Sequence, residues 1–530
     1  MNEPVASYAP GSPERDEILL ELARQSQTPM ELPLWLGGSR RFAGKREAVR
    51  APHRHSLILG YAVQATAREV EQAILFALEA RASWSRTPLA ERARIFLKAA
   101  ELLSGPFRAR MNAATMLGQS KTIYQSEIDA VAELVDFLRF NVKFALELEG
   151  QPLVSPKPTL NWLEMRPLEG FVYAVSPFNF TSIAANLPMA PVLMGNTVVW
   201  KPSGLAPLSA HYIMELLSAA GLPDGVVNLV QGDPIEISRQ VLGHPSFAGL
   251  HFTGGTSAFG SLWQQVGQNL DRYTSFPRIV GETGGKDFIF AHPSADREAL
   301  AVAIVRGAFE YQGQKCSAAS RIYLPQSIAM DVKRRVVEMM SEIRMGDIAD
   351  FKNFMGAVIG RGAFDRITQY QRLAQGDPAC QVLSGGTADD SEGYFVQPTL
   401  IETQDPRHAL MCEEIFGPVA TLWVYADDRF REALEICDQT SPYALTGAIF
   451  AQDRAAITEA SEVLRYSAGN FYINDKPTGA VVGQQPFGGG RRSGTNDKAG
   501  SFLNLVRWVS PRAIKENFCP PTDWRYPFMA

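Results

Sequence analysis

Residues 170–177, GFVYAVSP, and residues 195–202, GNTVVWKP, form two short apolar runs that decide the fold class. Each run is continuous and is bounded by glycine and proline, a pattern typical of a strand that is buried on both faces. The elements predicted after them are a helix at 208–220, strands at 225–232 (GVVNLVQG) and 248–255 (AGLHFTGG), and a helix at 256–270. Alternating strands and helices with short turns predict a parallel α/β sheet.

A second series of the same kind begins near residue 281. Its predicted elements are strands at 288–292, 321–325, 421–426, 447–451 and 469–475, with helices at 296–311 and 328–343. The first third of the chain is instead rich in helices, predicted at 66–83, 89–103 and 126–148 from their apolar spacing. The sequence therefore predicts two doubly wound, Rossmann-like α/β domains.

Two further segments, residues 161–167 and the apolar run FLNLVRWVS at 502–510, have no evident place in either sheet. We read both as extended strands. The hypothesis is that they leave the body together as a small β arm and pair with another subunit, which predicts a homodimer or a higher homo-oligomer.

Composition excludes several classes of protein. The 530 residues are 46% hydrophobic and 20% charged, and the net charge of −5 gives no basic excess for binding nucleic acid. No apolar run reaches the length of a membrane span. The five cysteines include no CxxC pair, which argues against a disulfide scaffold or a structural zinc site. The first 23 residues carry four acidic side chains before any apolar run, so we expect a cytoplasmic protein.

The common nucleotide and hydrolase fingerprints GxGxxG, GxxxxGK[ST], HExxH and GxSxG are absent. Three other motifs carry candidate chemistry. Cys316 lies in FEYQGQKCSAASR between Lys315 and Ser317, and a neighbouring cation and a polar turn lower the pKa of a thiol. Glu282 precedes a glycine pair in GETGGKDF, where a carboxylate can act as a mobile base. Asn179 in SPFNFT follows a buried strand and can donate to an oxyanion.

Taken alone, each of these residues has an ordinary interpretation, as a buried small hydrophobe, a surface acid and a turn residue. Three more motifs accompany them. Lys201 ends a strand, where α/β folds bind ligands, and FTGGTSAFG at 252–260 leads from a strand through two glycines into a helix that can bind phosphate. The sixth motif, EEIFGPV, contains Glu414 and Phe416.

Together the six motifs resemble the aldehyde dehydrogenase superfamily over nearly the whole chain, and within it the glutamate-semialdehyde (Δ1-pyrroline-5-carboxylate) dehydrogenases. The stretches that carry the second likeness are AELVDFLRFN (132–141), SPFNFTSIAANL (176–187), FEYQGQKCSAASR (309–321), GNFYINDKPTGAVVGQQPFGGG (469–490) and SGTNDKAG (493–500). The resemblance implies an NAD-binding domain over 1–148 and 168–281 and a catalytic domain over 282–478. It also implies an oligomerisation arm over 149–167 and 500–512 and a substrate-anchoring loop over 479–499.

The resemblance also implies a role for each matching position. Cys316 is expected as the nucleophile, Glu282 as the base for deacylation and Asn179 as the oxyanion donor. The residues expected at the cofactor are Ser176, Lys201, Gly254, Gly255, Thr256, Ser257, Ala258, Glu414 and Phe416. Those expected at the substrate are Glu133, Phe180, Lys315, Ser317, Gly479, Ala480 and Phe487, with the α-carboxylate at Ser317, Gly479 and Ala480 and the ammonium at Glu133. No metal is implied.

The implied activity is NAD-dependent oxidation of L-glutamate γ-semialdehyde to glutamate, the last step of proline breakdown, with a separate proline dehydrogenase as a possible partner. Gly204 stands where many NAD-preferring relatives carry an acid, so NADP is expected as a weaker cofactor. Three alternatives stay open: a dehydrogenase for succinate or aminoadipate semialdehyde, a non-catalytic protein of the same fold, and a cysteine hydrolase. The intact set of Cys316, Glu282 and Asn179 argues against the second, and the absence of a histidine near Cys316 in the sequence argues against the third.

Overall fold

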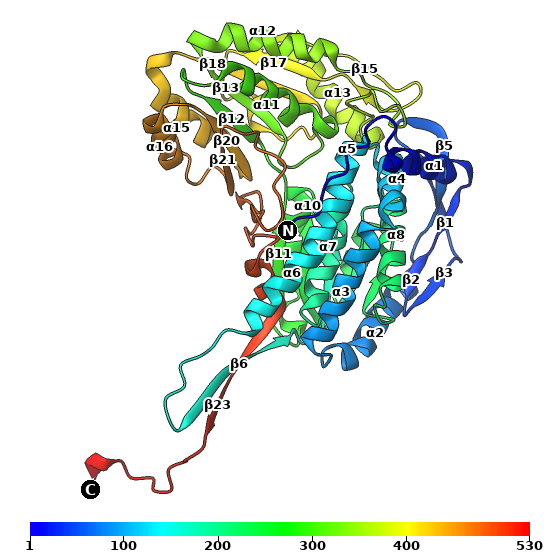
Figure 1. Ribbon diagram of the computed structural model, residues 1–530, viewed down its shortest axis with the longest axis vertical. Helices are drawn as coiled ribbons and strands as arrows, with labels where there is room; N and C mark the ends of the chain where they lie inside the picture. Colours follow the sequence, from blue (N-terminus) through cyan, green and yellow to red (C-terminus); the bar gives the residue numbers. More distant parts are fainter. Residues whose placement is uncertain (530) are drawn as a thin grey trace.

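The computed structural model describes residues 1–529, in which two α/β bodies are stacked above a long two-stranded arm (Figure 1). The lower body contains a seven-stranded sheet in the order β11-β10-β7-β8-β9-β2-β3. Its strands are β2 (Leu34–Leu36), β3 (Ser39–Arg41), β7 (Phe171–Val175), β8 (Thr197–Lys201), β9 (Val227–Leu229), β10 (Phe247–Thr253) and β11 (Arg278–Glu282). The five strands from β7 to β11 are parallel, whereas β2 and β3 form an antiparallel edge.

Helices cover both faces of this sheet because alternate residues of each strand point to opposite sides. Tyr173 and Val199 pack with α2 (Ala67–Trp84), α9 (Pro234–Leu242) and α10 (Thr256–Gln268). Val172 and Val198, one residue away, pack on the other side with α7 (Thr181–Leu193) and α8 (Pro207–Ala219). This arrangement confirms the doubly wound α/β class. It also explains why these strands read as continuous apolar runs.

An outer layer of helices covers this body. It consists of α1 (Pro13–Gln27), α3 (Leu89–Ser104), α4 (Arg108–Gln119), α5 (Ile123–Ser126) and α6 (Glu133–Glu149). The single helix expected over 126–148 is broken, because residues Glu127–Ala132 form a π-helical turn before α6 begins. A π turn inserts one extra residue per turn, which apolar spacing does not reveal, and such turns often occur at functional sites. A three-stranded sheet of β1 (Met30–Leu32), β5 (Arg54–Val63) and β4 (Arg46–Ala51) flanks the layer.

The upper body is built around a second seven-stranded sheet, in the order β14-β17-β18-β13-β12-β20-β21. Its strands are β12 (Asp287–Ala291), β13 (Ala319–Pro325), β14 (Cys380–Ser384), β17 (Thr399–Thr403), β18 (Val419–Tyr425), β20 (Thr446–Phe450) and β21 (Asn470–Ile473). Only the edge pair β14–β17 is antiparallel. One face packs on α11 (Arg297–Phe309) and α12 (Gln326–Glu342), and the other on α15 (Phe430–Thr440) and α16 (Arg454–Val463).

The remaining elements of this body are short or lie at its edge. They are α13 (Arg361–Gly376), α14 (Ala409–Cys412), β15 (Ala388–Asp389) with β16 (Phe395–Val396), and β19 (Tyr443–Ala444) with β22 (Gly490–Arg491). Through residues 1–529, no helix is both long enough and apolar enough to cross a membrane.

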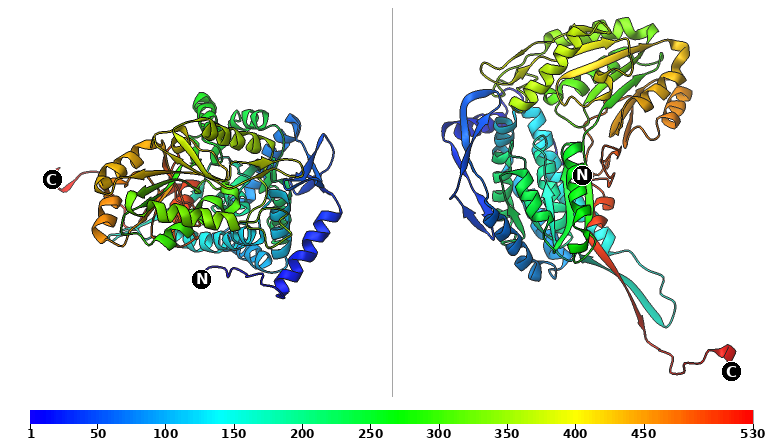
Figure 2. Two further views of the ribbon diagram at one scale, coloured as in Figure 1. Left: turned by 90° about the horizontal axis from the view of Figure 1, so that it is seen from above. Right: turned by 180° about the vertical axis from the view of Figure 1, so that it is seen from behind.

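The arm is a ribbon of β6 (Thr159–Pro167) and β23 (Val509–Asn517), antiparallel in register from Thr159↔Asn517 to Pro167↔Val509 (Figure 2). The strand expected at 502–510 is therefore largely wrong. Residues Phe502–Leu505 form helix α17 and Val506–Trp508 a 3-10 turn, so β23 begins only at Val509. The reason is tertiary packing. Leu505 and Trp508 are fully buried in the lower body, where the Trp508 ring lies 4.6 Å from His251.

Candidate active site

Cys316 lies in a loop between the last turn of α11 and β13, at a cavity between the two bodies. The loop is held by residues just before the thiol. Tyr311 and Gln312 adopt left-handed backbone angles (φ 49° and 55°), and both are buried. The Gln312 side chain donates to the carbonyls of Ser120 (3.0 Å) and Ala357 (2.8 Å). These bonds fix the loop to both bodies and therefore fix the position of the thiol.

Burial raises the pKa of the Cys316 thiol, and the negative charges of Asp287, Glu414 and Glu282 raise it further. The expectation that Lys315 lowers this pKa is therefore wrong. The Lys315 ammonium lies 3.4 Å from the Glu310 carboxylate, so its charge is already neutralised by a buried partner. The raised pKa favours the protonated thiol, and attack on a substrate requires the loss of that proton.

Glu282 ends β11 and lines the same cavity as Cys316. One carboxylate oxygen accepts a hydrogen bond from the Gly489 amide at 3.1 Å. The other oxygen lies 3.0 Å from the point that a Cβ atom on Gly488 would occupy. Burial raises the pKa of Glu282 well above its ordinary value, against a smaller lowering by the Gly489 bond and by Lys498. A carboxyl with a raised pKa in a cavity is the kind of group that acts as a general base.

Asn179 follows β7 and is buried just before the start of α7. Its side-chain amide donates to the carbonyl of Gln314 at 3.0 Å, two residues before the thiol. One of its two N–H groups is used by this bond, and the other remains for a developing oxyanion beside the loop. The structure thus brings Asn179 to the same loop that carries Cys316.

All seven residues expected at the substrate line one cavity together with Cys316 and Glu282. The cavity has an apolar part and a polar part. Phe180 and Phe487 belong to the apolar part, and the polar part includes Ser317, whose hydroxyl lies 2.8 Å from that of Thr478. Thr478 was not expected at the site, although it precedes Gly479 in the motif that was. Other lining residues that the sequence analysis missed include Ile128, Asp129, Phe137, Ile183, Val482 and Asn504.

The amine-binding candidate Glu133 is half-buried in the first turn of α6. Its carboxylate accepts a hydrogen bond from the Ser182 hydroxyl at 2.6 Å. Burial and the charge of Asp129 raise the pKa of Glu133 to about 8. Asp129 in turn pairs with the buried Lys121, whose pKa burial lowers to about 8. A cation entering the cavity would approach Asp129 and Glu133, close to the buried ammonium groups of Lys121 and Lys315.

The phosphate-binding candidates lie where β10 leads into α10. The amides of Thr256, Ser257 and Ala258 form the first turn of a 13-residue helix, where main-chain partners are lacking. A Cβ on Gly255 would meet open space, and the Thr256 hydroxyl oxygen is buried without a hydrogen-bond partner among residues 1–529. An open approach with free amides and an unpartnered hydroxyl fits a pyrophosphate.

Two charged groups, the buried Lys201 and the half-buried Glu414, complete this side of the molecule. The Lys201 ammonium has a single long contact, 3.4 Å to the carbonyl of Pro202, within the described chain, and burial lowers its pKa to about 8. Glu414 accepts from the Gly285 amide at 3.0 Å through one oxygen, and burial raises its pKa. A buried ammonium and a half-buried carboxylate with unused bonding capacity fit the hydroxyls of two ribose rings.

The other two cofactor candidates are already engaged within the protein. The Ser176 hydroxyl accepts a hydrogen bond from the Trp200 indole at 2.9 Å, and the Phe416 ring packs edge-on against Phe178 at 5.9 Å. Lys286 was not expected at the site, yet its ammonium is buried without a hydrogen-bond partner in the described part of the chain. Burial lowers its pKa to about 7, against an opposing effect of Glu414.

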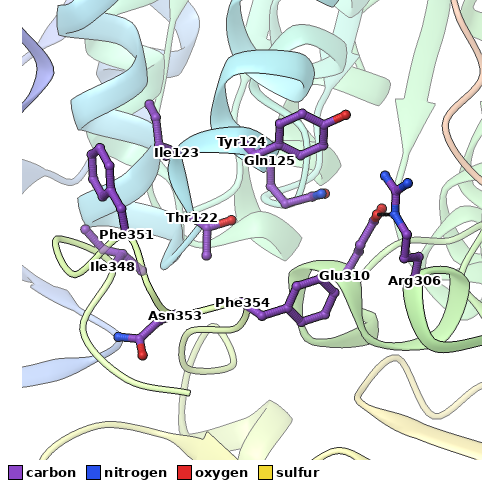
Figure 3. A pocket seen from close by; sticks show the side chains of 10 residues that line it. All are labelled: Thr122, Ile123, Tyr124, Gln125, Arg306, Glu310, Ile348, Phe351, Asn353 and Phe354. Atoms are coloured by element: carbon purple, nitrogen blue, oxygen red, sulfur yellow. Dashed lines mark hydrogen bonds and ion pairs between the residues drawn. The ribbon is translucent and has the colours of Figure 1, made fainter. Parts of the chain in front are cut away.

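A second cavity of about 240 Å³ lies between α5, the end of α11 and the loop after α12 (Figure 3). Arg306 and Glu310 lie side by side at one end of it, 2.8 Å apart. None of the residues expected at the site lines this cavity. Its connection to the thiol is Glu310, which contacts Arg306 here and Lys315 on the side of Cys316.

Comparison with known proteins gives a consistent set of similarities. A family model described as the aldehyde dehydrogenase family matches residues 41–508. The chain is 48% identical over 529 residues to the mouse protein named mitochondrial delta-1-pyrroline-5-carboxylate dehydrogenase, covering 100% of this chain and 94% of that one.

Two solved structures extend the comparison. The delta-pyrroline-5-carboxylate dehydrogenase from Mycobacterium tuberculosis bound with NAD is 52% identical with a TM-score of 0.97, covering 100% of this chain and 98% of that one. Proline utilization A from Bdellovibrio bacteriovorus is 28% identical with a TM-score of 0.93, covering 98% of this chain and 54% of that one.

Proposed function

This chain belongs to the aldehyde dehydrogenase family, and we propose that it oxidises L-glutamate γ-semialdehyde to L-glutamate with NAD. The free semialdehyde is in equilibrium with Δ1-pyrroline-5-carboxylate. The observation that carries the proposal is the single cavity that joins the Cys316 thiol, the half-buried Glu282 carboxyl and a set of polar groups suited to the amino-acid end of the substrate. Relatives named for this substrate, at about half identity over the full chain, support the same choice.

In the proposed mechanism Cys316 loses its proton to solvent and its sulfur attacks the aldehyde carbon. The resulting alkoxide accepts hydrogen bonds from the Asn179 amide and from the backbone N–H of Cys316. When bound, NAD would accept the hydride that leaves the substrate carbon, and the alkoxide thereby becomes the carbonyl of a thioester on Cys316. Glu282 then takes a proton from a water that attacks the Cys316 thioester, and glutamate leaves.

The pyrophosphate of NAD would bind to the backbone amides of residues 256–258, next to Gly254 and Gly255. Lys201 and Glu414 would bind the two riboses. Ser176 and Phe416 would border the cofactor. Gly204 offers no acid near Lys201, and a Cβ at this position would meet open space. A 2′-phosphate would therefore meet little repulsion, so we infer that NADP serves as a weaker cofactor.

Substrate choice would depend on the end of the molecule remote from the aldehyde. We infer that Ser317 and the backbone amides of Gly479 and Ala480 bind the α-carboxylate, since small side chains leave room there. Glu133 would pair with the ammonium, and Phe487 and Phe180 would pack on the carbon chain. Lys315, which is neutralised by Glu310, would orient the loop rather than supply a free charge.

The test of the function is an absorbance assay for reduced cofactor with three substrates and two cofactors. Glutamate, succinate and aminoadipate semialdehydes are each supplied with NAD and with NADP. We expect the highest kcat/KM for glutamate semialdehyde with NAD, and a lower but measurable rate with NADP. A higher kcat/KM for succinate or aminoadipate semialdehyde would contradict the substrate assignment, and no turnover of any aldehyde would favour the non-catalytic alternative.

Ala480→Leu is expected to lower kcat/KM for glutamate semialdehyde by about 10²-fold, because the larger side chain fills the space for the α-carboxylate and remote binding energy positions the aldehyde. Oxidation of propanal, which has no carboxylate, should change little. The matched control is Ala388→Leu, an exposed position on β15 in the upper body. Equal losses on both substrates would mean that the loop is structural.

The arm supports a proposal of a homodimer or a higher homo-oligomer. Both of its faces are partly exposed along the whole length of β6, and Leu160 and Trp162 are 44% and 37% exposed. Apolar side chains on an isolated ribbon need a partner surface. Light scattering during size-exclusion chromatography at micromolar protein is expected to give at least twice the chain mass, and the Leu160→Asp, Trp162→Asp double variant a smaller species. A clean monomer for the unaltered chain would overturn the proposal.

Two finer inferences concern the setting of the enzyme. We infer a cytoplasmic location. The mouse relative is instead named as mitochondrial, so fractionation of the native cells is needed to test this inference.

We also infer that the substrate comes from a proline dehydrogenase on a separate polypeptide. The chain covers 54% of the length of the proline utilization A protein to which it is similar. A coupled assay with added proline dehydrogenase tests this partnership.

A further inference from the structure

The first residues of the chain lie across the outside of the substrate cavity. In Figure 1 the dark blue N-terminal segment starts close to α6, at the middle of the molecule, and runs to α1. We call residues 2–8 the N-terminal strap. Its hydrogen bonds reach two elements that line the cavity, the anchoring loop after β21 and the π-helical turn before α6. No motif in the sequence analysis pointed to this segment.

Asn2 connects the anchoring loop to α6. Its side-chain amide donates to the carbonyl of Val482 (2.8 Å) and to the carboxylate of Asp136 (2.7 Å). Its side-chain oxygen accepts from the Gln484 amide at 3.0 Å. Val482 is buried and lines the substrate cavity two residues after Ala480. One asparagine therefore joins both ends of a short loop turn to the helix that carries Glu133.

Glu3 holds Asn2 in this position. Its backbone N–H donates to the Asp136 carboxylate at 2.7 Å. Its own carboxylate, almost buried, bridges two cations, at 2.8 Å from Arg108 and 2.7 Å from Arg139. Arg108 belongs to α4 and Arg139 to α6, so the strap is fixed to two helices before it reaches the loop.

The other end of the strap supports the π-helical turn. The Tyr8 hydroxyl donates to the Glu127 carboxylate at 2.8 Å, and the Ala6 amide donates to the same carboxylate at 3.0 Å. Glu127 is fully buried as the first residue of that turn, and it also accepts from the Asn112 amide at 2.7 Å. The turn presents Ile128 and Asp129 to the cavity and leads directly into Glu133.

We propose that the N-terminal strap is a positioning element for substrate recognition, holding the carboxylate-binding loop and the amine-binding carboxylates at a fixed separation across the cavity. The inference rests on the proposed function, because it takes the loop and Glu133 as the two ends of the recognition site. Recognition of both charged groups of an amino acid requires their partners to be fixed relative to each other. Without the strap, the loop and α6 lose the bonds through Asn2 that connect them.

The position of Asn2 makes this role separable from stability of the fold. Asn2 is only partly buried and belongs to none of the hydrophobic clusters, whereas Tyr8 is part of the core of the lower body. Asn2→Leu keeps a side chain of similar size and removes the three side-chain hydrogen bonds. Asn2→Gln keeps the donor and the acceptor on a longer side chain. Val5→Ala is the matched control, since Val5 lies in the strap with a 47% exposed apolar side chain.

Three measurements test the proposal on the full-length protein: steady-state kinetics with glutamate semialdehyde, kinetics with propanal, and amide hydrogen exchange of residues 479–485. For Asn2→Leu we expect KM for glutamate semialdehyde to rise about tenfold, with kcat within twofold and propanal kinetics unchanged. We expect the loop amides to exchange about tenfold faster. Asn2→Gln should recover KM to within threefold, and Val5→Ala should match the unaltered protein.

A KM within twofold of the unaltered protein for Asn2→Leu would overturn the positioning role, whatever the exchange result. Equal losses with propanal would also overturn it, since they would indicate a general structural effect. Failure of the proposed function has a different signature. In that case the unaltered protein oxidises propanal but not glutamate semialdehyde. Unchanged amide exchange of residues 479–485 in Asn2→Leu would separately overturn the positioning role of the N-terminal strap.

Discussion

Cys316→Ala is expected to reduce kcat for glutamate semialdehyde by more than 10²-fold while leaving NAD binding intact. The substitution removes the atom that forms the covalent bond to the substrate, and covalent catalysis typically contributes far more than this factor. The Lys201 ammonium contacts the Pro202 carbonyl and not the thiol, and the first turn of α10 belongs to a different segment from the loop that carries Cys316. Steady-state kinetics and calorimetric titration with NAD measure the two effects separately.

The control for this variant is Cys519→Ala, which removes an exposed cysteine beyond the arm and should leave kcat unchanged. Retention of more than about a hundredth of the activity in Cys316→Ala would contradict the assignment of the nucleophile. The raised pKa of the Cys316 thiol adds a second expectation. Inactivation of the free enzyme by iodoacetamide should be slow at pH 7 and should accelerate as pH rises, since only the thiolate reacts and its fraction grows with pH.

The sequence predicted the architecture well where each segment has a single environment. Strands such as 171–175 and 197–201 are buried on both faces, so their composition alone identifies them and their order predicts a doubly wound sheet. Residues 502–508 show the opposite case. They are apolar enough for a strand, but Leu505 and Trp508 pack into the lower body, and a short helix places both side chains there.

The site was predictable in its composition and not in its electrostatics. Motif likeness located Cys316, Glu282 and the anchoring loop, and the structure brings them to one cavity. The pKa of the thiol depends instead on groups distant in the sequence. Lys315 precedes the thiol, yet Glu310 neutralises it, while Asp287 and Glu414 converge on the sulfur from other strands and loops. The residues next to Cys316 in the sequence thus predict the wrong direction for the shift of its pKa.

Long-range hydrogen bonds set a similar limit. Asn2 and Val482 are separated by 480 positions, and the π-helical turn at 127–132 looks like ordinary helix in its apolar spacing. Both features shape the substrate cavity, and neither carries a local pattern. A single sequence therefore indicates which residues react more readily than which residues hold them in place.

Glu282→Gln is expected to reduce steady-state kcat by at least 10²-fold while preserving a first burst of reduced cofactor. Glutamine cannot take a proton from the attacking water, so the Cys316 thioester accumulates after one oxidation per active site. Glutamine keeps the size of the side chain and can still accept from the Gly489 amide. Stopped-flow absorbance measures the burst, and mass spectrometry of the acid-quenched enzyme should detect the acyl group on Cys316. The control is Glu402→Gln, a carboxylate that pairs with Lys333 at 2.9 Å on the upper body.

The pH dependence gives the same assignment an independent test. The active form of Glu282 is the carboxylate, and burial raises its pKa well above the ordinary value. Protonation therefore inactivates the unaltered enzyme as pH falls through this raised pKa, so kcat should rise with pH over the corresponding range instead of being level above pH 5. In Glu282→Gln this rise should be replaced by a residual rate proportional to hydroxide, because only hydroxide then attacks the thioester without a base. A variant that lacks the burst, or that keeps the pH profile of the unaltered enzyme, would show that Glu282 does not serve as the base for deacylation.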